Sequence, residues 1–458
     1  MDLQFVLSKG FYTLGKPRVM SAMHELDAQQ WLSHDEQEAL QRRQIQRLLE
    51  YVYEYVPYYR DLFRALDFHP SDFAADPACF ARLPLLTKSQ VQQNQERLVT
   101  TEPQRNRALY KVKTGGTTGE PMWLRQDQTY RDYNTAHVYQ EMTWAGWQIG
   151  RPQVWLWGHS VLAPTSVSRT AAVRDWIARR FESNAFHMDD ASMETLANYL
   201  ERHPDSELWS YVSTLYRFAQ FLAQRGRPVR VHAAHTAAEP LYDHQRQFIQ
   251  NTLDCPVFNS YSCVEIGSIA AECEQHTGLH LRTRNCYVEI VQPNPERPEG
   301  TLVVDNDAGE IVLTTLINYA FPLIRYRIED WGRKSPHACR CGRGLPMLEV
   351  VEGRVIDHFI TADGRQVWGA FLTPMVPLLG QIKQYQIVQE AVDLLVFRVI
   401  PAGPIHEDKF EDIRQAVKTV LGETVQARLE LIDELPATPT GKHRYTVCKA
   451  VPTNGSHH

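Results

Sequence analysis

A segment rich in glycine and threonine carries the clearest chemical signal in this chain. It follows two lysines at 110–113 and consists of Thr114, Gly115, Gly116, Thr117, Thr118 and Gly119. Glycines allow the backbone amides of such a loop to turn inward, and threonines add hydroxyl donors, so the loop suits a polyphosphate. The Walker and GxGxxG spacings are both absent. An ordinary glycine-rich turn between strands is the alternative interpretation.

A second group of polar residues follows a short apolar strand that we expect at 256–259. Tyr261 can stack on a purine, and Glu265, four positions later, can hold a divalent cation against phosphate. Ser262 and Cys263 lie between them. Without further context, an aromatic and an acidic residue at a strand end are more often structural.

Two single residues near the C-terminal third also have chemical potential. Asp330 follows an alternating strand pattern and can accept hydrogen bonds from a vicinal diol, as acidic residues do at the ribose of dinucleotide sites. Lys442 follows Thr440 and Gly441 in a loop punctuated by prolines, which makes it a mobile cation. An acidic turn and a solvated lysine are the alternatives.

Cysteines and histidines form a separate candidate site. The set comprises Cys273, His280, Cys339 and Cys341. Three thiols and one imidazole suit tetrahedral zinc, and four protein ligands indicate a structural rather than a catalytic ion. His276 is a rival ligand, and free thiols are the alternative. A zinc hydrolase would need an open metal position, which this ligand set does not leave.

Composition limits the classes of protein to be considered. With 458 residues, of which 43% are hydrophobic, the chain can bury a large core and should form two or more domains. The net charge is −6 and the basic residues are scattered, so we expect no nucleic-acid partner. We find no apolar run of about 18 residues, and therefore expect a cytoplasmic protein without a membrane span and with reduced cysteines.

Hydrophobic periodicity predicts the elements that carry these residues. Helical spacing covers 36–66, with a break near Pro57, and 127–147. Apolar strands at 154–158, 229–234 and 256–259 alternate with helices, which favours an α/β fold with a mainly parallel sheet. The last hundred residues contain strands around one helix at 406–421, which indicates a small α+β domain.

The order of these motifs resembles that of the adenylate-forming enzymes, in the branch of phenylacetate-CoA ligase and CapK-like proteins. The resemblance covers nearly the whole chain. It implies a large, multilayer α/β adenylation domain at 1–352. It also implies a small mobile α+β domain at 353–458 that carries the catalytic lysine.

The resemblance assigns roles to individual residues. The loop 114–119 would bind nucleotide phosphates, Tyr261 would pack on adenine and Glu265 would meet magnesium. Lys442 would bridge the attacking carboxylate and the α-phosphate. The remaining nucleotide contacts would come from Ala237, Ala238, Glu239, Ser262, Asp330 and Arg354. Ser262 and Cys263 depart from the family pattern in the loop after Tyr261. Ile356 departs from it at the hinge, so the residue that acts as the hinge stays open.

The implied function is activation of a carboxylic acid, with an aryl acid favoured, to an acyl-adenylate that is then transferred to CoA. ATP, Mg²⁺ and a structural Zn²⁺ are the expected cofactors. Aromatic residues that could line an acid pocket, or belong to the core, are Tyr139, Trp144, Trp147, Trp155 and Trp157. One alternative transfers the acyl group to an amine or hydroxyl, such as that of a sugar or a natural-product intermediate. Another is a nucleotide-binding protein with impaired catalysis. A homodimer is left open.

Overall fold

A computed structural model covers residues 1–458 and shows two compact units. The first contains Met1–Ile328 and Gly332–Val351, and the second contains Glu329–Trp331 and Glu352–His458. The structure describes all residues except 1–2, 114–121, 158–168, 186–187, 295–296, 304–306, 355–357, 363–365, 369–371, 373–374, 436–444 and 451–458.

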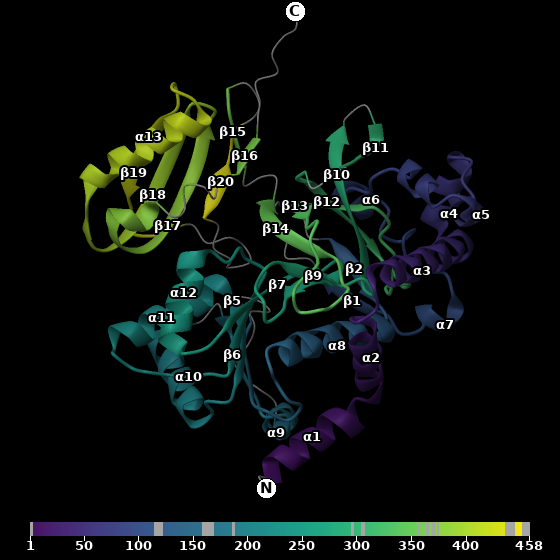
Figure 1. Cartoon of the computed structure of the whole chain (residues 1–458), viewed down its shortest axis with the longest axis horizontal. Helices are drawn as coiled ribbons and strands as arrows, with labels where there is room; N and C mark the ends of the chain where they lie inside the picture. The colour runs from purple at the N-terminus through teal and green to yellow at the C-terminus, as the bar shows by residue number, and fades with distance from the viewer. Residues whose placement is uncertain are drawn as a thin grey trace, which may run out of the picture. The chain divides into compact units, whose positions relative to one another are not determined.

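The chain begins with a run of helices (Figure 1). Helix α3 starts at a capping box, in which Ser33 and Glu36 exchange side-chain and backbone hydrogen bonds. Pro57 opens α4 at a position where its missing N–H costs nothing, which confirms the predicted break. The bounds are α1 (Leu3–Gly15), α2 (Pro17–Gln29), α3 (His34–Tyr55), α4 (Pro57–Ala65), α5 (Pro70–Ala75), a 3₁₀ helix η1 (Pro77–Arg82), α6 (Lys88–Gln93) and α7 (Pro103–Asn106).

A 12-stranded sheet forms the centre of the first unit, in the order β11-β10-β12-β13-β14-β9-β8-β7-β6-β5-β3-β4. Parallel pairing joins the last five strands of that order, and helices connect them along the chain. These elements are β3 (Gln153–Leu156), α9 (Arg169–Ile177), β4 (Arg180–Ser183), α10 (Asp190–Arg202), β5 (Glu207–Tyr211), α11 (Val212–Gln224), β6 (Ala233–Ala237), α12 (Asp243–Leu253) and β7 (Val257–Cys263).

The other half of the sheet contains antiparallel pairs, β7 with β8, β8 with β9, β9 with β14, and β10 with both β11 and β12. A separate antiparallel hairpin, β1 (Tyr110–Lys113) with β2 (Trp123–Gln126), flanks the glycine-rich segment. The strands are β8 (Gly267–Glu272), β9 (Leu279–Leu281), β10 (Cys286–Asn294), β11 (Arg297–Leu302), β12 (Gly309–Thr315), β13 (Tyr326–Lys334) and β14 (Met347–Arg354).

Helices cover both faces of the parallel strands. Because successive side chains of a strand alternate, Leu208 and Trp209 of β5 enter two different cores. Leu208 packs with α10, α11 and α12, which lie together in Figure 1. Trp209 packs with residues of α1, α2 and helix α8 (Gln128–Trp144). The fold therefore holds α8 against the sheet, and the prediction of a multilayer α/β architecture is confirmed.

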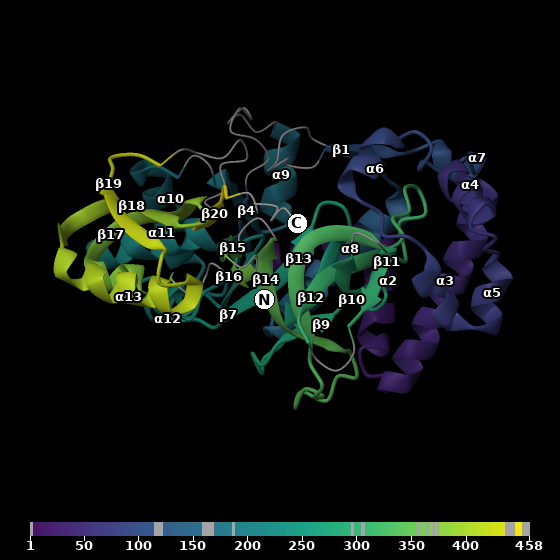
Figure 2. The ribbon, with the colours of Figure 1, turned by 90° about the horizontal axis from the view of Figure 1, so that it is seen from above.

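The second unit contains a small α+β domain, as predicted. Its four-stranded sheet has the order β19-β18-β17-β20, and α13 runs along it (Figure 2). Phe397 of β18 and Phe410 of α13 meet edge to face in its core. The elements are β15 (His358–Ile360), β16 (Gln366–Trp368), η5 (Val376–Leu379), β17 (Gly380–Ala391), β18 (Leu394–Ile405), η6 (Glu407–Lys409), α13 (Phe410–Leu421), β19 (Gln426–Leu431) and β20 (Thr446–Cys448). Among the described helices of the whole chain, none combines the length and apolarity needed to cross a bilayer.

Candidate active site and metal centre

Several predicted nucleotide contacts meet at the carboxyl ends of the parallel strands. Ala237 ends β6 opposite Ser260 of β7, so Ala238 and Tyr261 follow at the same edge of the sheet. Ligands of open α/β sheets bind at this edge. Ala238 has a φ of 68°, a left-handed conformation that is uncommon for a residue with a side chain and often marks a functional turn.

Glu239 has a clear structural task beside this edge. Its carboxylate accepts hydrogen bonds from the backbone N–H of Ser213, at 2.6 Å, and from the Ser213 hydroxyl, at 2.9 Å. Ser213 lies in the first turn of α11, where free N–H groups and the helix dipole favour a negative charge. Glu239 therefore ties the turn after β6 to α11, and its contact with a nucleotide stays a prediction.

The aromatic residues proposed for an acid pocket separate into two groups. Tyr139, Trp144 and Trp147 are buried in the protein core, and the half-buried Trp155 packs against it. Trp157, just after β3, stacks on Tyr211 at the end of β5, with ring centroids 4.4 Å apart. This stacked pair lies at the carboxyl edge of the sheet. Sequence reasoning included Trp157 but missed Tyr211.

Glu265 lies in a tight turn between β7 and β8. The thiol of Cys263 accepts a hydrogen bond from the N–H of Ile266, at 3.4 Å, which gives this unusual residue a structural role. Gly267 follows with a φ of 82°, and a Cβ added there would lie 2.0 Å from Oδ1 of Asn134. That oxygen also accepts a hydrogen bond from the N–H of Ser268, at 3.2 Å. Helix α8 therefore fixes the turn that presents Glu265.

A buried ion pair lies about two helical turns further along α8. The carboxylate of Glu141 accepts hydrogen bonds from the hydroxyls of Ser260, at 2.7 Å, and Ser268, at 2.8 Å. It also pairs with Arg282 at 2.8 Å, and both side chains are at most 3% exposed. A buried carboxylate with this many partners holds its neighbours firmly, since losing one partner would leave a charge unpaired. Glu141 thus ties β7, the strand that carries Tyr261, to the neighbouring β8.

Sequence analysis did not identify this polar face of α8. Asn134 and Glu141 are seven residues apart, which places them on one side of a helix. Together with the buried His137, they interrupt an otherwise aromatic and apolar surface. Polar residues at helical spacing on a face expected to be buried were the signal that could have revealed it.

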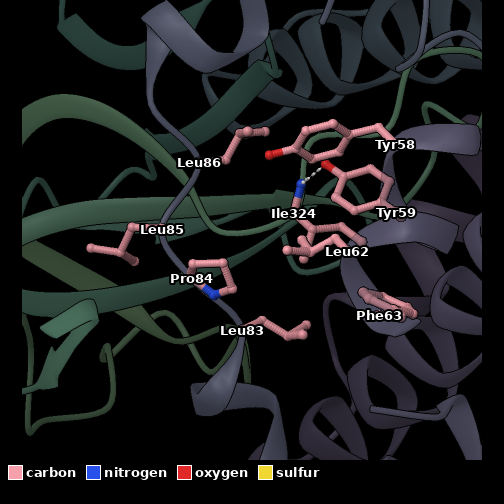
Figure 3. A pocket seen from close by; sticks show the side chains of 9 residues that line it. All are labelled: Tyr58, Tyr59, Leu62, Phe63, Leu83, Pro84, Leu85, Leu86 and Ile324. Atoms are coloured by element: carbon pink, nitrogen blue, oxygen red, sulfur yellow. Dashed lines mark hydrogen bonds between the residues drawn. The ribbon is translucent and has the colours of Figure 1, made fainter. Parts of the chain in front are cut away.

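The segment before Asp330 is held by Tyr59 of α4 (Figure 3). The Tyr59 hydroxyl donates a hydrogen bond to the carbonyl of Pro322, at 3.0 Å, and accepts one from the N–H of Ile324, at 2.9 Å. Arg325 is fully buried and pairs with Glu289. These contacts explain the arginine of this motif as part of the framework.

The structure describes Asp330 but leaves other predicted residues undetermined. Asp330 lies within β13, is half-buried and follows Glu329, whose φ is 64°. The glycine-rich segment 114–119 and Lys442 lie outside the described residues. Arg354 is the last residue of β14. The roles of these residues therefore stay predictions.

The four predicted zinc ligands come together in the first unit. One ligand atom from each of Cys273, His280, Cys339 and Cys341 lies within 4.8 Å of the others. The two sulfur atoms of Cys273 and Cys339 are 3.7 Å apart, and Sγ of Cys341 is 3.4 Å from Nε2 of His280. A tetrahedron with Zn–S bonds of about 2.3 Å has S···S edges of about 3.8 Å. The spacing fits a zinc ion, and all eight cysteines are free of disulfides.

The surroundings of His280 also suit metal coordination. Its Nδ1 lies 3.4 Å from the carbonyl of Leu345, so an N–H there leaves Nε2 free to face the cluster. Burial lowers the pKa of His280 to about 4, which keeps the imidazole neutral, as a metal ligand must be. The rival His276 instead lies 3.1 Å from a carboxylate oxygen of Glu272. These residues would hold a zinc ion that joins β8 and β9 to the segment before β14.

Comparison with known proteins gives concordant results for both units. Residues 359–449 match the CapK C-terminal domain family. Phenylacetate-coenzyme A ligase of Escherichia coli K12 is 26% identical over 343 residues, which cover 73% of this chain and 75% of the relative. Protein CapK of Staphylococcus aureus is 19% identical over 423 residues, covering 89% of this chain and 88% of the relative.

A solved structure has the same fold over nearly the whole chain. The crystal structure of 2-hydroxyisobutyryl-CoA ligase in the postadenylation state aligns with a TM-score of 0.71 at 19% identity. The alignment covers 93% of this chain and 91% of that protein. The large unit with its extended mixed sheet and the small α+β unit therefore follow a fold known among CoA ligases.

Proposed function

Because the chain is a homologue of phenylacetate-coenzyme A ligase and CapK and has the fold of a CoA ligase, we propose that it is an AMP-forming carboxylate–CoA ligase. The acid's carboxylate oxygen attacks the α-phosphorus of ATP, and pyrophosphate leaves. The thiolate of CoA then attacks the acyl carbon, and AMP leaves.

The observation that carries this proposal is the built turn at the carboxyl edge of the sheet. Tyr261 lies in strand β7 and Glu265 in the turn that follows it, and Asn134 and Glu141 of α8 hold β7 and β8 in place. A preorganised position matters because electrostatic stabilisation of the transferring phosphoryl group requires groups that do not have to move during the reaction. Glu265 would hold a magnesium ion, which neutralises charge on the phosphates when bound.

The remaining roles are assigned to residues of the two units. In this proposal the segment 114–119 cradles the phosphates, while Asp330 and Arg354 contact the ribose. Lys442 stabilises the charge that develops between the carboxylate and the α-phosphorus. The small unit, from about residue 353, carries Lys442 in and out and excludes water from the reactive mixed anhydride.

The stacked pair of Trp157 and Tyr211 supports an aryl acid as the substrate. Both rings lie at the carboxyl edge of the parallel strands, and a planar ring can stack or pack edge to face against such a pair. The zinc centre is structural in this proposal. It supplies folding free energy, since its ligands lie on separate segments that the metal would join.

The acceptor has a second candidate, because the likeness to CapK extends over more of the chain than the likeness to phenylacetate-coenzyme A ligase. In that case an amine or a hydroxyl attacks the acyl-adenylate in place of CoA. A screen of aryl, fatty and amino acids by ATP–pyrophosphate exchange identifies the acid. Product analysis with and without CoA then separates a thioester from an amide or ester.

A further inference from the structure

A pocket of ≈ 190 Å³ opens in the first unit between α3, α7, the start of α8 and the segment after β12. Its lining residues are all described, and none of them is an aspartate or a glutamate. Two aliphatic side chains form part of the wall, and the polar lining consists of Gln44, Arg47, Arg105, Thr129, Arg284 and Tyr319. Three guanidinium groups without a carboxylate among them make this wall rich in hydrogen-bond donors.

Carboxylates outside the lining hold two of the arginines in place. The Nε–H of Arg105 donates a hydrogen bond to the carboxylate of Glu102, at 3.0 Å, and its Nη1 donates one to the carboxylate of Asp127. The Nε–H of Arg284 donates a hydrogen bond to the carboxylate of Glu25, at 2.6 Å. One terminal NH₂ group of each arginine has no hydrogen bond to any described residue. These groups are oriented donors, because the carboxylates already fix the guanidinium planes.

Gln44 and Arg47 contribute donors that lack a partner in the described part of the chain. They lie three residues apart on α3, which places them on one face of the helix. Gln44 is only 5% exposed, yet neither its Nε2 nor its Oε1 has a hydrogen-bond partner. Leaving a buried amide unpaired is destabilising, so this amide, which is unpartnered among the described residues and lines the pocket, favours a polar ligand there. Arg47 is exposed and makes no ion pair with described residues.

Tyr319 lines the pocket together with the three arginines. Burial raises the pKa of its phenol, the charges of Arg284, Arg105 and Arg47 lower it, and the charge of Glu50 raises it. The three arginines line the pocket from α3, from α7 and from the segment between β9 and β10, and Arg105 lies over the Tyr319 ring, 5.1 Å from its centroid. Donors that approach from several directions suit a tetrahedral acceptor with several oxygens better than a planar carboxylate.

We infer that this pocket binds a phosphate group. The ligand is either free inorganic pyrophosphate or the phosphate of a larger molecule such as CoA, since both offer the same acceptor chemistry and the pocket is open to solvent. The inference stands apart from the proposed adenylation, because none of the lining residues belongs to the predicted nucleotide site.

Calorimetric titration of the full chain at low salt provides the test, with the nucleotide site first saturated by α,β-methylene-ATP. The probes are pyrophosphate, CoA and 3′-dephospho-CoA. Arg47→Gln should raise the Kd of the binding probe about tenfold, as expected for one lost charge-assisted contact. Arg43→Gln is the matched control, since Arg43 is also an exposed arginine of α3 but does not line the pocket. It should change the Kd by less than about twofold.

The probes also distinguish the sources of the phosphate. Binding of pyrophosphate identifies a free-anion site, whereas binding of CoA that is lost with 3′-dephospho-CoA identifies the 3′-phosphate of CoA. Either pattern, with the stated difference between the two arginine variants, supports the inference. Absence of binding by all three probes, or equal weakening by Arg47→Gln and Arg43→Gln, would overturn it.

A second variant keeps the test independent of charge. Gln44→Leu replaces the unpartnered amide with an apolar side chain of similar size, which should not lower the melting temperature. The same change should weaken the binding probe about tenfold, because it removes the buried donor from the pocket. An unchanged Kd in a folded Gln44→Leu protein would show that this amide does not face a ligand, and would contradict the inference.

Discussion

Gly267→Ala is expected to damage the turn that carries Glu265 more than its small size suggests. Gly267 has a φ of 82°, and placing a Cβ in a left-handed conformation costs roughly 1–2 kcal/mol. The new methyl would also lie 2.0 Å from Oδ1 of Asn134, and overpacking of this kind typically costs about 1–3 kcal/mol. Together these effects predict a loss of about 2–5 kcal/mol in the free energy of unfolding.

Two further variants separate the strain from the clash. Gly226→Ala is the matched control, because Gly226 has a φ of 57° but no atom within 4 Å of the added Cβ. It should cost only about 1–2 kcal/mol. Asn134→Ala removes the obstructing amide, together with its hydrogen bond to Ser268. The double variant of Asn134 and Gly267 should therefore cost about 1–3 kcal/mol less than the sum of the single variants.

Urea denaturation of the four proteins measures these differences. Magnesium titration of the exchange activity adds a functional measurement, in which Gly267→Ala should require more magnesium and Gly226→Ala should not. Equal costs for the two glycine substitutions, or strictly additive costs in the double variant, would refute the argument that Asn134 and Gly267 together fix this turn.

Three further predictions concern the assigned roles. Lys442→Ala should abolish most adenylation but spare thioester formation from a supplied acyl-adenylate. Lys409→Ala, which changes an exposed lysine of the same unit, should spare both half-reactions. Equal loss of both half-reactions in Lys442→Ala would contradict the role of Lys442 in adenylation. Glu265→Gln should lower magnesium-dependent turnover far more than stability, and parental activity at saturating magnesium would remove the metal assignment. Elemental analysis should find about one zinc per chain. Cys339→Ser should lower the zinc content and the melting temperature together. Cys79→Ser, in the core away from this site, should leave the zinc content unchanged. A stable parent protein without zinc would show that these cysteines are ordinary thiols.

The helical break at Pro57 was predictable because it depends on local chemistry. Proline restricts its own φ and lacks an N–H, and these properties act whatever the rest of the chain does. The strand expected at 229–234 was placed too early, since β6 begins at Ala233. Val229 and Val231 are buried in the connection before β6. The alternation of apolar and polar residues there therefore reflects burial of the valines and not pairing in the sheet.

The site could be predicted only where its residues are close in sequence or form a recognisable set. Cys273 and Cys339 could be predicted to share a site because few residue types bind zinc. Their sulfur atoms are adjacent in the structure, 3.7 Å apart. Asn134 and Glu141 were missed because their partners, such as Ser268, lie more than a hundred residues away. A polar residue on a helix shows its function only when the strand that it contacts is known.

ATP–pyrophosphate exchange with the purified protein tests the central claim most directly. The account predicts that at least one carboxylic acid, with aryl acids favoured, stimulates incorporation of labelled pyrophosphate into ATP, and that Lys442→Ala abolishes this exchange. Absence of exchange with every aryl, fatty and amino acid, in a protein that still binds ATP, would contradict it. The chain would then be a nucleotide-binding protein that has lost adenylation.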